Sequence, residues 1–200
     1  HLQMSTLPMT CASFDAALSS LRSVKYRPDI NVQETPAPQR LAPFSVALSG
    51  EIVADDDEIA SGRWVLLHDP EGIDSWQGNF RVVTYVKAAV DIEIAADPLL
   101  PSVGWAWLRE ALTEANCDPV ALGGTVTRVS SEGFGTLTPL ADEASSRGHI
   151  EIRASWTPRQ GGEELGADAL AWAELMAQAA GLLPTPVGLP QLTNAELQSR

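Results

Sequence analysis

The sequence predicts an α+β domain, an antiparallel sheet of about five strands with three helices packed mainly on one face. Periodicities typical of helices and strands follow one another in the order helix, three strands, helix, two strands, helix. No long crossover separates the strands within a group, so hairpins and antiparallel pairing are expected. The chain has 200 residues, 44% hydrophobic and 20% charged, which suits one globular core.

The first helix is expected from about Ala12 to Val24, because apolar residues recur there at helical spacing and Ser13 can cap its start. It ends before Pro28. Residues 28–43 contain four prolines, which predict an extended arm along the domain surface rather than a regular element.

Three strands are expected next, at 44–53, 63–68 and 80–94. The acidic run 55–58 reads as the turn after the first, and Asp69 to Gly72 as the turn after the second. In the third, alternate positions from Phe80 are apolar, and Arg81, Tyr85 and Lys87 occupy the opposite face.

The second helix is expected to open at Asp97-Pro98 and to run to about Ala115. Strands at 124–131 and 149–157 follow, and a last helix covers 167–182. The glycine pair before the fourth strand reads as a turn. We expect one domain over 12–183, with a cloning remnant and an N-terminal arm at 1–11 and a proline-rich tail at 184–200.

Charge and composition exclude several functions. The net charge of -13 would repel a phosphate backbone, so direct nucleic-acid binding is not expected. No apolar run is long enough to cross a membrane, and no secretory signal is recognised. Two distant cysteines suit neither a metal cage nor a disulfide framework. We therefore expect a cytoplasmic protein without a metal or cofactor.

Catalytic motifs are weak. His68 and Asp69 could form an acid–base dyad, but adjacent strand residues point to opposite faces, and Asp69 before Pro70 suits an Asx turn instead. Ser130 and Ser131 lack the glycines of a nucleophile elbow. The acidic run 55–58 could hold calcium, yet it lacks the spacing of a calcium loop, and a solvated turn explains it.

The outward face of the sheet is the more informative candidate. We expect five charged residues to gather there: Arg81, Lys87, Arg128, Glu151 and Arg153. They can pair across strands as a ladder of ions, or the arginines can bind an anionic ligand or an acidic partner segment. Trp76, in a loop, either pins that loop or contacts a partner, and Trp105 lies off the main apolar stripe of its helix, as expected of an interface.

Several strings resemble the actinobacterial domain-of-unknown-function 3000 family, in the family's order. They are QRLAP (39–43), GRWVLLHDP (62–70), WQGNFR (76–81), ADPLLP (96–101), GTVTR (124–128) and IEIRASWTP (150–158). The family implies no activity; its members are often encoded beside a ribonuclease D-like exonuclease, which makes that enzyme a partner by association. The matching strings contain these polar and aromatic residues: Arg40, His68, Asp69, Trp76, Gln77, Arg81, Asp97, Arg128, Glu151 and Arg153. A buried salt-bridge network that fixes the arm onto the sheet would explain this set as well as ligand binding does.

The order of elements also resembles that of type III secretion chaperones, which are small, acidic, non-catalytic and usually dimeric. We therefore expect a non-enzymatic binding or regulatory module, chaperone- or adaptor-like and homodimeric, that holds a protein partner through the sheet face or the Trp105 side of its helix. The alternative is a small-molecule or anion-binding enzyme that works through Arg128, Arg153, Glu151 and His68.

Overall fold

The computed structural model describes residues 11–137, 146–159 and 162–183. The expected ends of the chain, 1–10 and 184–200, lie outside these residues. The elements are α1 (Ala12–Arg22), β1 (Asn31–Thr35), β2 (Phe44–Ala54), β3 (Asp57–Ile73), η1 (Asp74–Trp76), β4 (Gly78–Val90), α2 (Ile92–Ala95), α3 (Leu100–Glu114), β5 (Pro119–Glu132), η2 (Gly135–Leu137), β6 (Ser146–Pro158), η3 (Gly162–Glu164) and α4 (Leu165–Ala179). The α+β class and the antiparallel sheet are confirmed, with six strands and four α-helices among the described residues instead of five and three.

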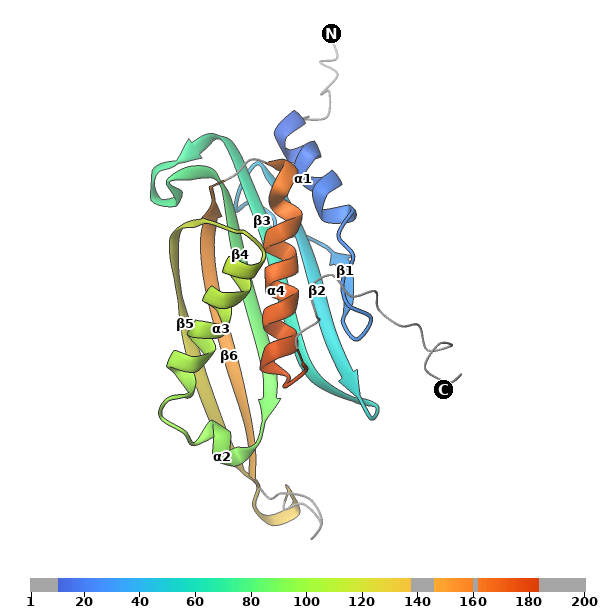
Figure 1. Cartoon of the computed structure of the whole chain (residues 1–200), viewed down its shortest axis with the longest axis vertical. Helices are drawn as coiled ribbons and strands as arrows, with labels where there is room; N and C mark the ends of the chain where they lie inside the picture. The colour runs from blue at the N-terminus through green and yellow to red at the C-terminus, as the bar shows by residue number, and fades with distance from the viewer. Residues whose placement is uncertain (1–10, 138–145, 160–161, 184–200) are drawn as a thin grey trace, which may run out of the picture.

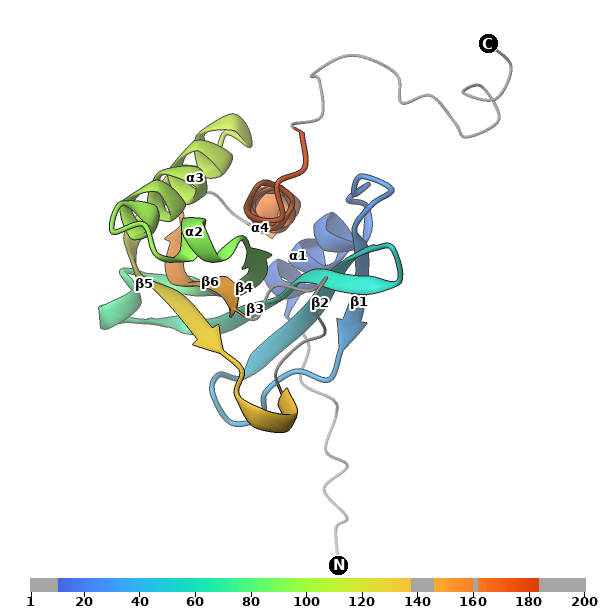
Figure 2. The ribbon, with the colours of Figure 1, turned by 90° about the horizontal axis from the view of Figure 1, so that it is seen from below.

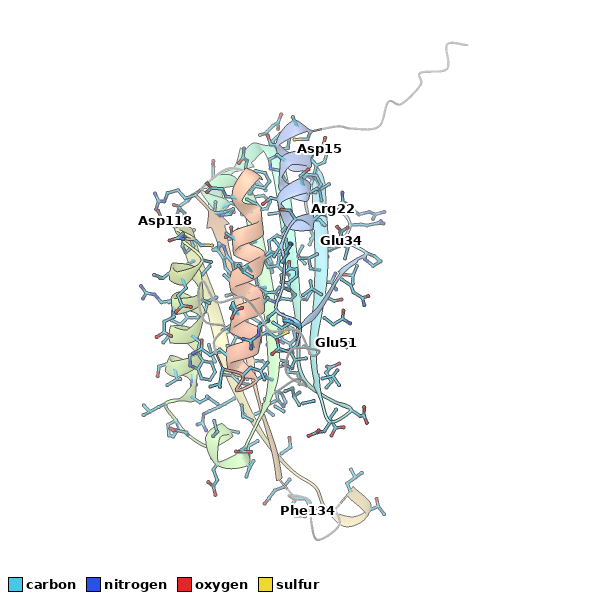
Figure 3. The ribbon with its side chains drawn as sticks, turned by 45° about the vertical axis from the view of Figure 1, so that its right-hand side comes forward. Asp15, Arg22, Glu34, Glu51, Asp118 and Phe134 are labelled. Atoms are coloured by element: carbon cyan, nitrogen blue, oxygen red, sulfur yellow. The ribbon has the colours of Figure 1, made fainter. Side chains whose placement is uncertain are left out.

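The two additional elements fall inside segments for which the sequence predicted another structure. β1 falls inside the expected arm, in a stretch without proline between Pro28 and Pro36, so its amide groups are free to pair with β2. An ion pair of 2.8 Å between Arg22 and Glu34 links this strand to α1 (Figure 3). The third strand was expected to run to residue 94, but β4 ends at Val90 and α2 takes the place of its last residues.

The sheet has the order β1-β2-β3-β4-β6-β5, and all of its pairs are antiparallel. The helices α1, α4 and α3 lie side by side on one face, with α4 over the central strands (Figures 1 and 2). No α-helix covers the opposite face in the described part of the chain, and we call it the outer face. The expectation of helices mainly on one face is therefore confirmed.

The main core lies between the helices and the inner face of the sheet. Alternate residues of β4 and β6 point into it, as their sequence pattern predicts: Phe80, Val82, Val86, Ile150, Ile152 and Trp156 are buried. On β2 and β3, Gly50 and Gly62 make room for α4. A Cβ on Gly62 would lie 2.6 Å from the Met176 methyl group and 2.9 Å from Nε1 of Trp172, so the glycines form the socket into which α4 packs.

A second, smaller cluster lies on the outer face. Ala47, Val65 and Leu67 are buried there under Ala37, Ala42 and Trp76, and we call these six residues the outer cluster. The proline-rich arm thus folds over one corner of the outer face. Ser45 holds it through a hydrogen bond of 3.2 Å from its hydroxyl to the carbonyl of Pro38. The expectation that the arm lies along the surface is confirmed, but the expectation that it contains no regular element is wrong, because Asn31–Thr35 form β1 against β2.

One predicted turn is correct and another is displaced. Asp55 and Asp56 have φ values of 51° and 64°, the left-handed pair of a two-residue hairpin turn between β2 and β3. The expected turn at Asp69 to Gly72 is part of β3, and the chain reverses at η1 instead. Asp69 does accept the Glu71 amide at 3.0 Å, which is the contact of an Asx turn.

No helix among the described residues has the length and apolar character needed to span a bilayer.

Candidate functional site

The outer face contains an open hollow of about 570 Å³ beside the outer cluster. It is lined by Arg63, Val65, Val83, Thr84, Tyr85, Gly123, Gly124, Thr125, Arg153, Ala154 and Ser155, from four neighbouring strands β3, β4, β6 and β5. The described residues that line it include no Asp or Glu, although the whole chain has 26 acidic residues against 13 basic ones. The hollow therefore has a charge opposite to that of the molecule as a whole.

Strand register sorts the outward side chains of the hollow into two rows. In the first row, Arg63 pairs with Tyr85, Tyr85 with Arg153, and Arg153 with Thr125. We call it the cationic row. The second row lies two residues further along each strand and runs Val65, Val83, Ser155 and Gly123. We call it the apolar row, and its Val83 is 41% exposed.

Glycines on β5 open the floor of the hollow. A Cβ on Gly124 would lie 2.1 Å from the carbonyl oxygen of Arg153, so only glycine lets β5 approach β6 this closely. A Cβ on Gly123 would meet nothing within 4 Å, because it would point into the hollow. The ladder is irregular between Val120 and Gly123, and this bulge aims the glycine outward. The prediction that this pair forms a turn is wrong.

Hydrogen bonds and stacking fix the cationic row. The Arg153 guanidinium lies 4.8 Å from the centre of the Tyr85 ring, and the Tyr85 hydroxyl donates to Glu151 at 2.6 Å. Burial and Glu151 raise the pKa of Tyr85 to about 12. The Tyr85 hydroxyl, Arg153 and His149 lower the pKa of Glu151. Both groups thus keep one protonation state at neutral pH, and they serve to position Arg153, whose side chain remains 55% exposed.

Arg63 stands at the other end of the cationic row and is exposed. Its guanidinium lies 3.5 Å from the carbonyl of Pro36, at the start of the arm. Arg63 is not among the residues that the sequence marked as candidates. The only signal for it was its place in an alternating strand, and the outer cluster hid that signal because Val65 and Leu67 make both faces of β3 apolar.

Arg81 borders the hollow, and its guanidinium is held by side chains of the neighbouring strand. It donates to Ser155 at 2.8 Å and to Thr157 at 3.2 Å. Thr157 in turn donates to the carbonyl of Trp76. Burial lowers the pKa of Arg81. These contacts hold the η1 turn against β6, so both Arg81 and Trp76 fit a positioning role, and the indole pins its loop.

Arg128 lies on the opposite face from its expected position. It pairs with the buried Ile150 and donates to the carbonyls of Ala95 and Ala96, at 3.2 and 3.1 Å. It therefore holds the C-terminal end of α2. The prediction that Arg128 lies with Arg81, Glu151 and Arg153 on the outward face is wrong, because its side chain belongs to the helix-covered side.

His68 also faces the core rather than the hollow. Its ring is 1% exposed and stacks on Phe80 with centroids 4.0 Å apart. Its Nδ1 donates to the carbonyl of Asn79 at 2.8 Å, which leaves Nε2 as the acceptor for the Cys11 thiol at 3.4 Å. Burial lowers the pKa of His68, so the imidazole is uncharged at neutral pH and the thiol lacks a cationic neighbour. The structure does not bring His68 together with Arg153 and Glu151.

The remaining predicted residues lie apart from the hollow lining. Arg40 and Gln77 are exposed and have left-handed φ values of 68° and 57°, Arg40 in the arm and Gln77 in the turn before β4. Trp105 is half-buried against the main core. Of the predicted set, only Arg153 lines the hollow, while Glu151 and Arg81 contact residues of its lining.

The described residues contain no group of three His, Cys, Asp or Glu side chains arranged to hold a metal ion. Glu151 lies 3.7 Å from Arg153 and 4.0 Å from His149, and both of these neighbours are on its own strand, β6. The expected ladder of ion pairs across strands is therefore not found among the ion pairs of the described residues.

Fold and hollow together define a class of small α+β protein: a six-stranded antiparallel sheet that carries its α-helices on one face and leaves part of the other open. The chain belongs to the DUF3000 family, described as a protein of unknown function, whose model matches residues 10–188. No curated protein and no solved structure matches it.

Proposed function

We propose that this protein is a non-enzymatic binding or regulatory module that holds its ligand in the hollow on the outer face. The observation that carries the proposal is the hollow itself, which combines an apolar row with a cationic row on rigid strands in an otherwise acidic chain. Concave sites of several hundred Å³ with few polar groups are typical of ligand binding.

Binding is favoured over catalysis by the state of the nearby titratable groups. A general acid or base works best with a pKa near the working pH. Around the hollow, the pKa of Tyr85 is raised to about 12 and that of Glu151 is lowered, so both are far from neutrality. His68 lies on the other side of the sheet, and burial lowers its pKa. These positions argue against the alternative of an enzyme built on His68 and Arg128.

The test is recovery of a ligand from the native cells. We would purify the chain with an affinity tag and compare it with G123F, whose new side chain would fill the hollow, and with A89F as a control elsewhere on the outer face. A small molecule or protein that accompanies the parent chain and A89F but not G123F supports the proposal. Equal recovery with G123F, or no companion with any of the three, would contradict it.

A protein partner is a second candidate, favoured by one further observation. Leu99 and Val103, at the start of α3, are 65% and 42% exposed, and Trp105 follows on the same helix. A homodimer or a partner such as the exonuclease could bind there. Light scattering tests the homodimer. The parent chain should have the mass of a dimer, and V103E should have the mass of a monomer. The cytoplasmic location stays a prediction.

A further inference from the structure

We propose that the ligand of the hollow is a small amphiphilic carboxylate, with its apolar body on the apolar row and its head group between Arg63 and Arg153. This inference rests on the proposed function and specifies the chemistry of the ligand at that same site.

The two rows have the spacing that such a ligand needs. Arg63 and Arg153 are separated by Tyr85 on the strand between them, so their Cα atoms lie about 10 Å apart, two strand spacings. Side chains of arginine length can bridge that gap onto a single head group. The apolar row begins two residues along each strand, about 7 Å away, which a head and a short apolar chain can span.

The charge distribution favours an anion. Both charged side chains in the described lining are arginines, whose planar guanidinium groups match a carboxylate with paired hydrogen bonds. Thr125, which pairs with Arg153 in the cationic row, adds a hydroxyl group beside the arginines. A cationic ligand would meet two like charges and no carboxylate among these residues, so it should bind poorly.

The charge balance also favours a monoanion over a dianion. Glu151 lies 3.7 Å from Arg153 and already neutralises part of its charge. Arg81, the next cation, is held by Ser155 and Thr157. Arg81 keeps its charge, but its donors are already used by two hydroxyl groups, so the guanidinium donors open to a ligand are those of Arg63 and, in part, Arg153. Two such donors suit one carboxylate better than a phosphate dianion.

The volume limits the size of the ligand. A hollow of about 570 Å³ falls in the range of small-molecule sites and is large enough for a chain of about ten to twelve carbons or a pair of fused rings. Val83 supplies the exposed apolar contact, and Gly123 leaves the floor open.

The experiment is a calorimetric titration of the full chain with dodecanoate and with dodecyltrimethylammonium, which has the same tail and the opposite charge. Both are used below their critical micelle concentrations. We expect one dodecanoate per chain and no saturable binding of the ammonium compound.

R63Q and R153Q should each weaken dodecanoate binding about tenfold, because each removes a charge-assisted hydrogen bond. R22Q, which removes an exposed cation of α1 on the helix-covered side of the sheet, should change affinity less than twofold. Thermal unfolding of each variant shows whether it is folded. If R153Q is destabilised, the result for R63Q decides the test, because Arg63 is exposed and its replacement should leave the fold intact.

Each other outcome overturns the inference in a distinguishable way. Equal binding of both amphiphiles, abolished by G123F, would refute the choice of a carboxylate and leave the hollow as a binding site. Binding that is insensitive to R63Q, R153Q and G123F would place dodecanoate elsewhere. If dodecanoate does not bind at all but a protein from native cells is lost on G123F, the occupant is a protein and the carboxylate proposal is wrong. If no companion is found either, the proposed function fails as well.

Discussion

Replacing Asp168 with asparagine should stabilise the protein at neutral pH and remove much of the pH dependence of its stability. Asp168 lies in the first turn of α4, is 5% exposed and accepts a hydrogen bond of 2.7 Å from the Trp156 indole. Burial raises the pKa of its carboxyl from 3.8 to about 6, and the Trp156 bond opposes the shift only in part. Asparagine keeps an oxygen acceptor for Trp156 and cannot ionise.

The sign and size of the effect follow from linkage. A carboxyl whose pKa is raised on folding stabilises the native state below its unfolded pKa and loses that contribution as pH rises through the folded value. The window here runs from about pH 4 to about pH 6. A shift of about two units corresponds to about 3 kcal/mol in the free energy of unfolding. The difference between D168N and the parent chain should therefore grow by about that amount between pH 4 and pH 7.

Urea denaturation at pH 4, 5, 6 and 7 measures this difference, with linear extrapolation to water. D118N is the matched control, because Asp118 forms an exposed ion pair of 2.6 Å with Arg159 near the same end of the molecule (Figure 3) and should contribute less than about 1 kcal/mol at any pH. A difference for D168N that is constant across this range, or a variant less stable than the parent at pH 7, would refute the reasoning.

Three further predictions concern packing. G62V should destabilise the fold by about 1 to 3 kcal/mol, because its side chain would collide with Met176 in the socket of α4. G123A should change the stability by no more than about 0.5 kcal/mol, because its methyl group would meet no other atom. Thermal unfolding compares the two variants, and an equal loss of stability in both would contradict the role of Gly62 in the socket. R128Q should accelerate amide hydrogen exchange in α2 and lower the stability by about 1 kcal/mol, because it removes two hydrogen bonds to the end of that helix. An unchanged exchange rate would count against this role of Arg128. W76A should expose the outer cluster, so the arm should be cleaved by protease at least several times faster than in the parent chain, and an unchanged rate would show that the indole does not hold it.

Alternation in the central strands was sufficient to predict which of their residues are buried. β4 and β6 are covered by helices on one face and more open on the other, so their apolar and polar residues alternate with period two. The same pattern placed Arg81, Glu151 and Arg153 on the outer face, where the structure has them. Helices α1, α3 and α4 were predicted from the 3.6-residue spacing of their apolar stripes, within a few residues at each end.

The alternation of apolar and polar residues did not predict side-chain orientation in strands whose two faces are buried to a similar extent. β5 is an edge strand, and most of its residues are exposed or half-buried, so no pattern shows which way Arg128 points. Its pairing with Ile150 decides that. On β3, the outer cluster buries Val65 and Leu67 opposite Trp64 and Leu66, so nothing in the sequence marks Arg63 as outward or His68 as inward.

The sequence by itself determined the class of fold, the antiparallel sheet, the helix-covered face and the orientation of the central strands, because these depend on local periodicity and on the burial of apolar side chains. The tertiary structure alone decided the candidate site. The hollow joins residues of β3 and β5 that are about sixty positions apart, and their meeting depends on strand order, on register and on the bulge before Gly123. A single bulge or a shift of one residue moves a side chain to the other face of a sheet, and no local pattern records it.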